Sequence, residues 1–174
     1  MSNKIITIFG TGRAKPDDEA YELAQDIGKL LAQAGFTIAN GGYGGTMLAA
    51  AKAAAEAHGE TIGVTCSAFA ATPNKYISRK IVTDSLDERL DTLIKLGHAY
   101  IVLPGGTGTL LELAKVWELK NKGFLQQQKP IILVGAFWTP LIDLVATDDP
   151  DSKQYVQQLN EPKQIIEFIK QSVI

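Results

Sequence analysis

The sequence predicts a three-layer α/β fold built on a doubly wound, mainly parallel sheet of about six or seven strands. Short β-branched runs alternate with longer segments of helical period. Several of the runs are apolar throughout, which is typical of strands covered by helices on both faces. With 174 residues and no internal repeat or flexible linker, the chain is expected to form one Rossmann-like domain over residues 1–174.

The first four elements follow one another directly. Residues 4–9 form a β-branched run and are expected to be the first strand. Residues 17–34 repeat apolar side chains on one helical face, and Gly35 ends that helix. A second strand is expected at 36–39, and an alanine-rich helix at 46–57.

The next elements include the least regular part of the chain. A strand is expected at 61–65 and another at 81–83, with a loop at 66–80 that could cover a site. A helix then begins at Ser85, because Ser85 and Glu88 have the spacing of a capping box. The buried stripe of this helix is expected to contain Leu86, Leu90 and Leu93.

The last third of the chain continues the alternation. The run 99–103 is so apolar that it is expected to be a central strand, and a helix is expected at 109–122. A buried strand follows at 130–134, and Thr139-Pro140 marks a helix start. The final elements are expected to be an edge strand at 155–159 and a helix at 162–171 with Ile165, Ile166 and Ile169 facing inward.

Composition excludes several classes of function. There are 17 basic and 19 acidic residues and no basic run, so a nucleic-acid partner is not expected. No segment approaches the ~20 apolar residues of a membrane span, and the apolar run at 5–9 is too short for a signal peptide. The single cysteine, Cys66, fits the cytoplasm. His58 and His98 are isolated and expected to be solvated or structural, so neither a metal nor a cofactor is expected.

Three glycine-rich turns follow predicted strands. Because the carboxyl ends of parallel strands share one edge of the sheet, these turns are expected to lie together. Glycine lets the backbone approach a ligand closely, and the amides of a helix start attract an anion. We therefore expect a site for the phosphate of a nucleotide-like ligand. The turns are Gly10-Thr11-Gly12, Gly41-Gly42-Tyr43-Gly44-Gly45 and Gly105-Gly106-Thr107-Gly108-Thr109.

Two common phosphate motifs fit poorly. The first turn has Lys15 where a dinucleotide fingerprint has its third glycine, and the second strand is followed by Asn40 instead of an acid. No Gly-Lys-Ser/Thr sequence occurs, which excludes a P-loop. Taken alone, the glycines of the first turn are explained equally well by a tight turn.

The segment from Pro104 to Glu112 matches the pattern Pro-Gly-Gly-x-Gly-Thr-x-x-Glu. With Arg89 in the preceding helix and a Gly-Gly-x-Gly-Gly-x-Met turn ending at Met47, it resembles the LOG family of cytokinin-activating phosphoribohydrolases, formerly called lysine decarboxylase-like. The resemblance covers residues 4–134 and continues more faintly to the end. It implies a Rossmann-like homodimer that cleaves a nucleoside 5′-monophosphate to free base and ribose 5-phosphate.

The resemblance also implies roles for particular residues. Arg89 and Glu112 fall on the two positions that are catalytic in the LOG family. The positions that correspond to its phosphate loop and its other pocket glycines are Gly105, Gly106, Thr107, Gly108, Thr109, Gly41, Gly42, Gly44, Gly45, Gly10 and Thr11.

The chemistry of the reaction suits these residue types. Hydrolysis of an N-glycoside passes through an oxocarbenium-like sugar, which the carboxylate of Glu112 could stabilise or supply with an oriented water. Arg89 could pair with the phosphate or keep Glu112 ionised. Two structural interpretations stay open: Thr109-x-x-Glu112 is itself a capping box, and Arg89 could extend along the edge of its helix toward solvent.

Three departures from the LOG pattern leave the substrate open between AMP, a cytokinin-type nucleotide and another relative. Leu90 and Leu111 stand where that family often has lysine and a second glutamate, and the loop 66–80 offers no carboxylate to a ribose. The alternative to a hydrolase is a non-enzymatic nucleotide or molybdenum-cofactor carrier. A pyridoxal-phosphate decarboxylase is disfavoured, because no lysine has a marked position for the Schiff base.

Overall fold

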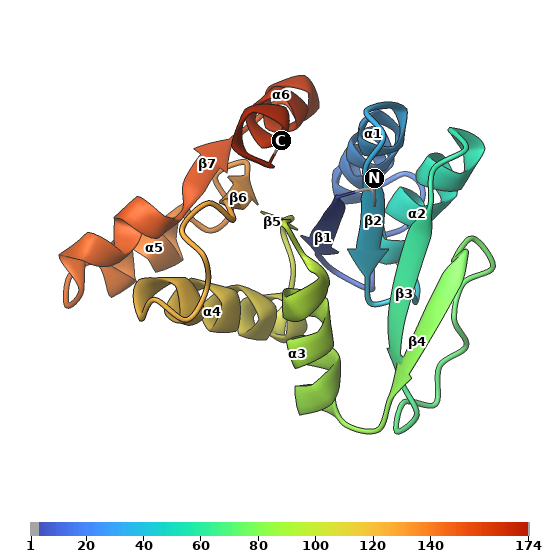
Figure 1. Cartoon of the computed structure of the whole chain (residues 1–174), viewed down its shortest axis with the longest axis horizontal. Coiled ribbons are helices and arrows are strands. Elements are labelled where there is room, and N and C mark those ends of the chain that lie inside the picture. Colours follow the sequence, from blue (N-terminus) through green and yellow to red (C-terminus); the bar gives the residue numbers. More distant parts are fainter. Residues whose placement is uncertain (1–3, 174) are drawn as a thin grey trace.

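The computed structural model describes residues 4–173. Within that range, seven strands form one parallel sheet in the order β4-β3-β2-β1-β5-β6-β7 (Figure 1), which confirms the predicted fold class. The strands are β1 (Ile5–Phe9), β2 (Thr37–Asn40), β3 (Thr61–Cys66), β4 (Arg79–Thr83), β5 (Ala99–Val102), β6 (Ile131–Val134) and β7 (Gln157–Leu159).

Helices cover both faces of the sheet (Figure 1). Side chains alternate between two hydrophobic cores, because successive strand residues point to opposite faces. Ile6 and Ile8 of β1 pack with α1, α2 and α6, whereas Phe9 packs with α3, α4 and α5. The helices are α1 (Glu19–Gln33), α2 (Thr46–Glu56), α3 (Leu86–Leu96), α4 (Thr107–Asn121), α5 (Thr139–Val145) and α6 (Pro162–Val173), with a 3-10 helix at Pro150–Tyr155.

The order of the strands creates a switch point between β1 and β5. From β1 the chain builds outward through β2 and β3 to β4, then crosses back to pair β5 with the free side of β1. Thr7 of β1 lies opposite Tyr100 of β5 in this pairing. Ligands of doubly wound folds bind beyond the carboxyl ends of the strands at such a point, so the loops after β1 and β5 are expected to border a binding site.

The expected elements are confirmed to within two residues, and two differences in detail matter for function. Leu86 was expected in the buried stripe of α3, but its side chain is 45% exposed, and Arg89 faces inward with Leu90 and Leu93. The helix expected from residue 109 begins at Thr107, because glycine at 106 serves as the N-cap.

The two histidines occupy structural positions. His98 accepts a hydrogen bond through Nδ1 from the amide of Ile5 at 3.2 Å. His58 has a φ of 61° in the turn after α2. In the part of the chain that the structure describes, no three His, Cys, Asp or Glu side chains are placed to hold a metal ion. None of the helices described there is long and apolar enough to span a membrane.

Helices α1 and α2 approach each other closely at Gly28. A Cβ added at Gly28 would lie 2.8 Å from Cα of Ala50 and closer still to its carbonyl oxygen. Alanine is the better helix former by about 1 kcal/mol, so this glycine is required by packing between the helices.

We expect Gly28→Ala to lower the free energy of unfolding by about 1–3 kcal/mol, because the two backbones must move apart. Gly108→Ala is the matched control, since it also lies inside a helix and its Cβ would meet nothing within 4 Å. Urea unfolding of both variants measures the difference. Equal stability of the two variants would contradict the packing role.

Candidate functional site

A pocket of ≈ 710 Å³ opens at the switch point of the sheet. The loops after β1 and β5, the second glycine turn, α3 and α4 all contribute to it. Of the residues that the sequence analysis proposed, those that line the pocket are Gly10, Thr11, Arg89, Gly106, Thr107, Gly108, Thr109 and Glu112.

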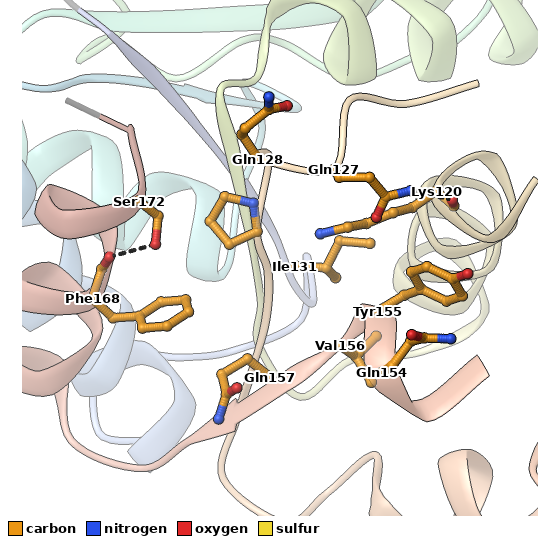
Figure 2. Close-up of a pocket in the computed structure, with 11 residues that line it drawn as sticks. Lys120, Gln127, Gln128, Ile131, Gln154, Tyr155, Val156, Gln157, Phe168 and Ser172 are labelled. Atoms are coloured by element: carbon orange, nitrogen blue, oxygen red, sulfur yellow. Dashed lines mark hydrogen bonds between the residues drawn. The ribbon is translucent and has the colours of Figure 1, made fainter. Parts of the chain in front are cut away.

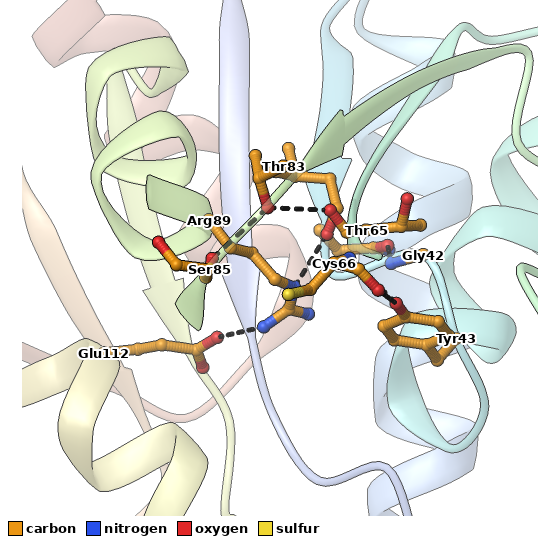
Figure 3. Close-up of polar contacts among 10 residues, drawn as sticks. Gly42, Tyr43, Thr65, Cys66, Thr83, Ser85, Arg89 and Glu112 are labelled. Atoms are coloured by element: carbon orange, nitrogen blue, oxygen red, sulfur yellow. Dashed lines mark hydrogen bonds and ion pairs between the residues drawn. The ribbon is translucent and has the colours of Figure 1, made fainter. Parts of the chain in front are cut away.

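Arg89 is buried at the floor of this site. Its Nε donates a hydrogen bond to the carbonyl oxygen of Val64 at 2.8 Å, and its Nη1 lies 3.9 Å from Oε1 of Glu112 (Figure 3). The guanidinium also lies 5.6 Å from the ring centroids of both Tyr43 and Phe69. These contacts, with a side chain only 10% exposed, exclude the interpretation in which Arg89 extends toward solvent.

Gly41 makes room for this arginine. A Cβ at Gly41 would overlap Nη2 of Arg89 and would lie 2.6 Å from the sulfur of Met47. Gly41 does not line the pocket, but the site requires a glycine there, because any side chain would displace the guanidinium of Arg89. Gly41 acts on the site through Arg89.

Glu112 projects from the second turn of α4, and its side chain is only 14% exposed. Burial raises the pKa of Glu112 to about 7, while the positive charge of Arg89 acts in the opposite direction. Because α4 begins at Thr107, Glu112 lies beyond the first turn and no side chain caps this helix start. The capping interpretation of Glu112 is therefore wrong, and the pocket holds an acid that changes protonation state near neutral pH.

The third glycine turn forms the start of α4. The first amides of a helix have no acceptor within the helix, and no side chain caps them here. Gly106, Thr107, Gly108 and Thr109 border the pocket at this point. Gly105 lies just behind them, where a Cβ would overlap the Thr109 side chain. This helix start is suited to hold an anion.

The second glycine turn has a different task. The amide and the hydroxyl of Thr46 both donate to the carbonyl oxygen of Thr11, at 2.9 and 3.0 Å, so the first amide of α2 holds the first glycine turn. Asn40 holds the turn by accepting from the amide of Gly42 at 2.8 Å and donating to the carbonyl of Met47 at 3.1 Å. Gly45, with a φ of 61°, allows the close contact with the first turn.

The glycines of this second turn lie outside the pocket lining, although the turn carries two lining side chains. The proposed residues that do not border the pocket are Gly41, Gly42, Gly44, Gly45 and Gly105. The lining residues that were not proposed from the sequence are Gly12, Arg13, Tyr43, Met47 and Phe69. All of these except Phe69 lie in or next to a glycine turn, and that position in the sequence could have indicated them.

Phe69 enters the pocket from the loop between β3 and β4, which was expected to cover a site. Asn74 ties this loop to the second turn, because its side-chain amide donates to the carbonyl of Tyr43 at 2.9 Å and its backbone amide to that of Gly42 at 2.8 Å. The hydroxyl of Tyr43 in turn accepts from the amide of Cys66 at 2.9 Å (Figure 3). The aromatic side of the pocket is thus fixed at several points.

Another hollow, of ≈ 310 Å³, lies at the opposite edge of the sheet, where β6 and β7 begin (Figure 2). It contains the buried Lys120, whose Nζ donates to the carbonyl oxygen of Lys129 at 2.8 Å. Lys120 lies in the last turn of α4, where a cation is favoured by the helix dipole. Through this hydrogen bond Lys120 stabilises the turn that leads into β6.

Fold and pocket together define a doubly wound α/β protein with an acid, a guanidinium and a free helix start at the switch point of its sheet. The chain belongs to the SLOG cluster4 family, whose model matches residues 3–166. This match, with the relatives described next, confirms the resemblance inferred from the sequence.

Two kinds of characterised relative match the chain. It is 37% identical over 127 residues to the cytokinin riboside 5′-monophosphate phosphoribohydrolase of Mycobacterium tuberculosis, covering 67% of this chain and 63% of that protein. It is 30% identical over 129 residues to the pyrimidine/purine nucleotide 5′-monophosphate nucleosidase of Escherichia coli K12, covering 68% of this chain and 28% of that protein. The chain thus spans less than two-thirds of the length of each.

Solved structures match along the whole chain. The molybdenum cofactor binding protein of Rippkaea orientalis superposes with a TM-score of 0.82 at 28% identity, covering 100% of this chain and 99% of that one. The molybdenum cofactor carrier protein of Chlamydomonas reinhardtii has a TM-score of 0.75 at 26% identity and covers 98% of both chains.

The raised pKa of Glu112 predicts an effect on stability. The folded pKa of about 7 exceeds the ordinary value of 4.5, so the folded protein loses stability as pH rises between these values. Glu112→Gln stays neutral. Its free energy of unfolding should exceed that of the wild type by up to about 3 kcal/mol above pH 7, and by little near pH 5.

Urea unfolding at pH 5 and pH 8 measures this difference. Glu118→Gln is the control, because Glu118 lies on the same helix but is 60% exposed and forms only an i,i+4 pair with Lys122. A Glu112→Gln variant that is less stable than the wild type at pH 8 would show instead that the ion pair with Arg89 is a net structural contribution.

Proposed function

We propose that this protein hydrolyses the N-glycosidic bond of a nucleoside 5′-monophosphate, releasing free base and ribose 5-phosphate. The observation that carries the proposal is the placement of Glu112, a buried acid with a pKa near 7, in the same pocket as the uncapped start of α4. The names of the mycobacterial and E. coli relatives, which act on nucleoside 5′-monophosphates, support the same reaction class.

In this proposal the third glycine turn binds the 5′-phosphate. Amides at a helix start favour a phosphate, and a fixed phosphate places the rest of the nucleotide relative to Glu112. We assign phosphate binding to Gly106, Thr107, Gly108 and Thr109, with Gly10 and Thr11 bordering the same cavity.

Glu112 is the proposed catalytic carboxylate. Hydrolysis breaks the bond between C1′ and the base nitrogen, adds water oxygen to C1′ and gives the base a proton. The ionised carboxylate stabilises positive charge on the sugar and accepts a proton from water, and the protonated acid can then deliver it to the base. A pKa of about 7 for Glu112 makes both forms accessible near neutral pH.

Arg89 positions Glu112 in this scheme. Its Nε is committed to Val64, and its Nη1 lies 3.9 Å from the carboxylate, beyond hydrogen-bond distance. The guanidinium lowers the pKa of Glu112 from where burial alone would place it, so part of the population is ionised at neutral pH.

A carrier of a nucleotide or of a molybdenum cofactor is the second candidate, favoured by the full-length similarity to the two cofactor-binding structures. Both candidates need an anion-binding turn, but a carrier has less need of a buried acid such as Glu112. Incubation with AMP, other nucleoside monophosphates and isopentenyl-AMP separates them. Tight binding without release of base would favour the carrier.

The homodimer and the cytoplasmic location remain predictions. Exposed apolar side chains lie on α3 and α4, the two helices that border the pocket, and a homodimer interface could cover them. These include Leu86 at the start of α3 and Leu110 and Leu111 in α4.

Glu112→Gln should lower kcat for AMP hydrolysis by about 10²–10⁴, the usual contribution of a general acid or base. Ribose 5-phosphate should bind the variant within a few-fold of the wild type, because the phosphate amides are unchanged. Glu118→Gln is again the control and should keep full activity. Loss of kcat and ribose 5-phosphate binding together would show that Glu112 holds the ligand and does not act on it chemically.

The pH profile tests the protonation state. Since the carboxylate form starts the reaction, kcat/KM should rise with pH to a plateau with a midpoint near 7, the pKa of Glu112 in the free enzyme. Arg89→Gln removes the charge that lowers this pKa and should move the midpoint upward. The substrate phosphate, with a pKa of about 6, cannot produce that shift. An unmoved midpoint would refute the assignment.

A further inference from the structure

Among the side chains described as lining the pocket, two carry a positive charge, Arg13 and Arg89. Arg89 is committed to the Val64 carbonyl and paired with Glu112. Arg13 is exposed, and no carboxylate of the described residues lies within ion-pair distance of it. The pocket therefore has one basic side chain whose charge is not already used.

The turn that carries Arg13 is held firmly although the side chain is exposed. Its amide donates to the hydroxyl of Thr11 at 3.1 Å, and the Thr11 carbonyl receives both donors of Thr46. The position of Arg13 relative to the start of α2 is thus fixed by three hydrogen bonds. Only the side chain of Arg13 must be ordered when a ligand binds.

This turn cannot bind an anion in the way the third turn can. Helix α1 begins only at Glu19, well after the glycines, and has acidic residues Glu19 and Glu22 in its first turn. At the start of α2 the amide of Thr46 already donates to the Thr11 carbonyl. The third glycine turn leads directly into a helix start without a side-chain cap, and the charge that the first turn brings to the pocket is the side chain of Arg13.

The charge of the ligand also calls for this arginine. A phosphate monoester carries about −1.5 to −2 near pH 7, whereas a helix start supplies only about +0.5. The charge of Arg89 is offset as soon as Glu112 ionises. A guanidinium that is always protonated and donates in a planar fork is the side chain best suited to the remaining phosphate charge.

We propose that Arg13 is the residue that selects phosphorylated substrates, by binding the 5′-phosphate in the pocket that it lines together with the start of α4. The inference rests on the proposed function, because it assumes a nucleoside monophosphate in this pocket. It adds a specificity residue to the site: Arg13 distinguishes a nucleotide from the corresponding nucleoside, while Glu112, positioned by Arg89, acts at the glycosidic bond.

Calorimetric titration with ribose 5-phosphate tests the proposal without catalysis. Arg13→Ala should weaken binding by about 10-fold or more, as expected for loss of a charge-assisted hydrogen bond, and should flatten its dependence on salt. Arg13→Lys should recover part of the affinity. Lys15→Ala is the matched control, because Lys15 is an exposed cation two residues away that does not line the pocket.

Kinetics give a second readout. For AMP, Arg13→Ala should raise KM by a similar factor and leave kcat within about 3-fold, since the groups at the glycosidic bond are intact. Its activity on AMP relative to adenosine should fall. Thermal unfolding confirms that the variant is folded.

The outcomes separate the two proposals. Unchanged ribose 5-phosphate affinity in Arg13→Ala would overturn the role of Arg13, even if the wild type hydrolyses AMP. If the wild type binds AMP without cleaving it and Arg13→Ala loses that binding, the role of Arg13 holds and the hydrolase proposal fails. Failure of the wild type to bind either ligand would overturn both.

Discussion

The site depends on one buried contact, the approach of the Arg89 guanidinium to the Glu112 carboxylate at 3.9 Å. Taking two charges out of water is costly, and their attraction compensates only when geometry and additional hydrogen bonds are favourable. Arg89 has such support from the Val64 carbonyl and two aromatic rings, whereas Glu112 has little besides Arg89 itself. The cost of burial therefore falls mainly on the acid, which explains why the pKa of Glu112 is raised while a cation lies beside it.

The topology of the sheet brings these two residues together. Helix α3 leads into β5 and α4 leads out of it, so both helices cover the same face beside the strand at the switch point. Arg89 lies four residues into α3 and Glu112 six residues into α4. Both residues are therefore close to the start of their helix, at the carboxyl end of the sheet. The helix start of the third glycine turn directly follows β5, so the same strand brings this uncapped start to the acid and the guanidinium.

The sequence predicted the fold well because apolar runs and helical period reflect burial directly. The sequence motifs also predicted that Arg89 and Glu112 lie in one site at the same edge of the sheet. It could not distinguish the tasks of the three turns, because these depend on distant contacts such as the bond between Thr46 and Thr11. Periodicity placed Leu86 and Arg89 near the same face of α3 and could not show that the arginine turns inward while the leucine is exposed. Phe69 lies in an irregular loop that carries no periodic signal.

A structural ion pair and a reactive one differ in the direction in which they move the acid. A well-matched pair with hydrogen bonds to both carboxylate oxygens stabilises the charge and lowers the pKa. At Glu112 burial moves the pKa upward, and the charge of Arg89, 3.9 Å away and hydrogen-bonded to the Val64 carbonyl, only partly opposes this. Burial of Glu112 therefore lowers the stability of the folded protein above neutral pH and brings the pKa of this acid to about 7. Raised pKa values of this kind cluster at sites where chemistry or ligand binding depends on the proton, which supports the role proposed for Glu112.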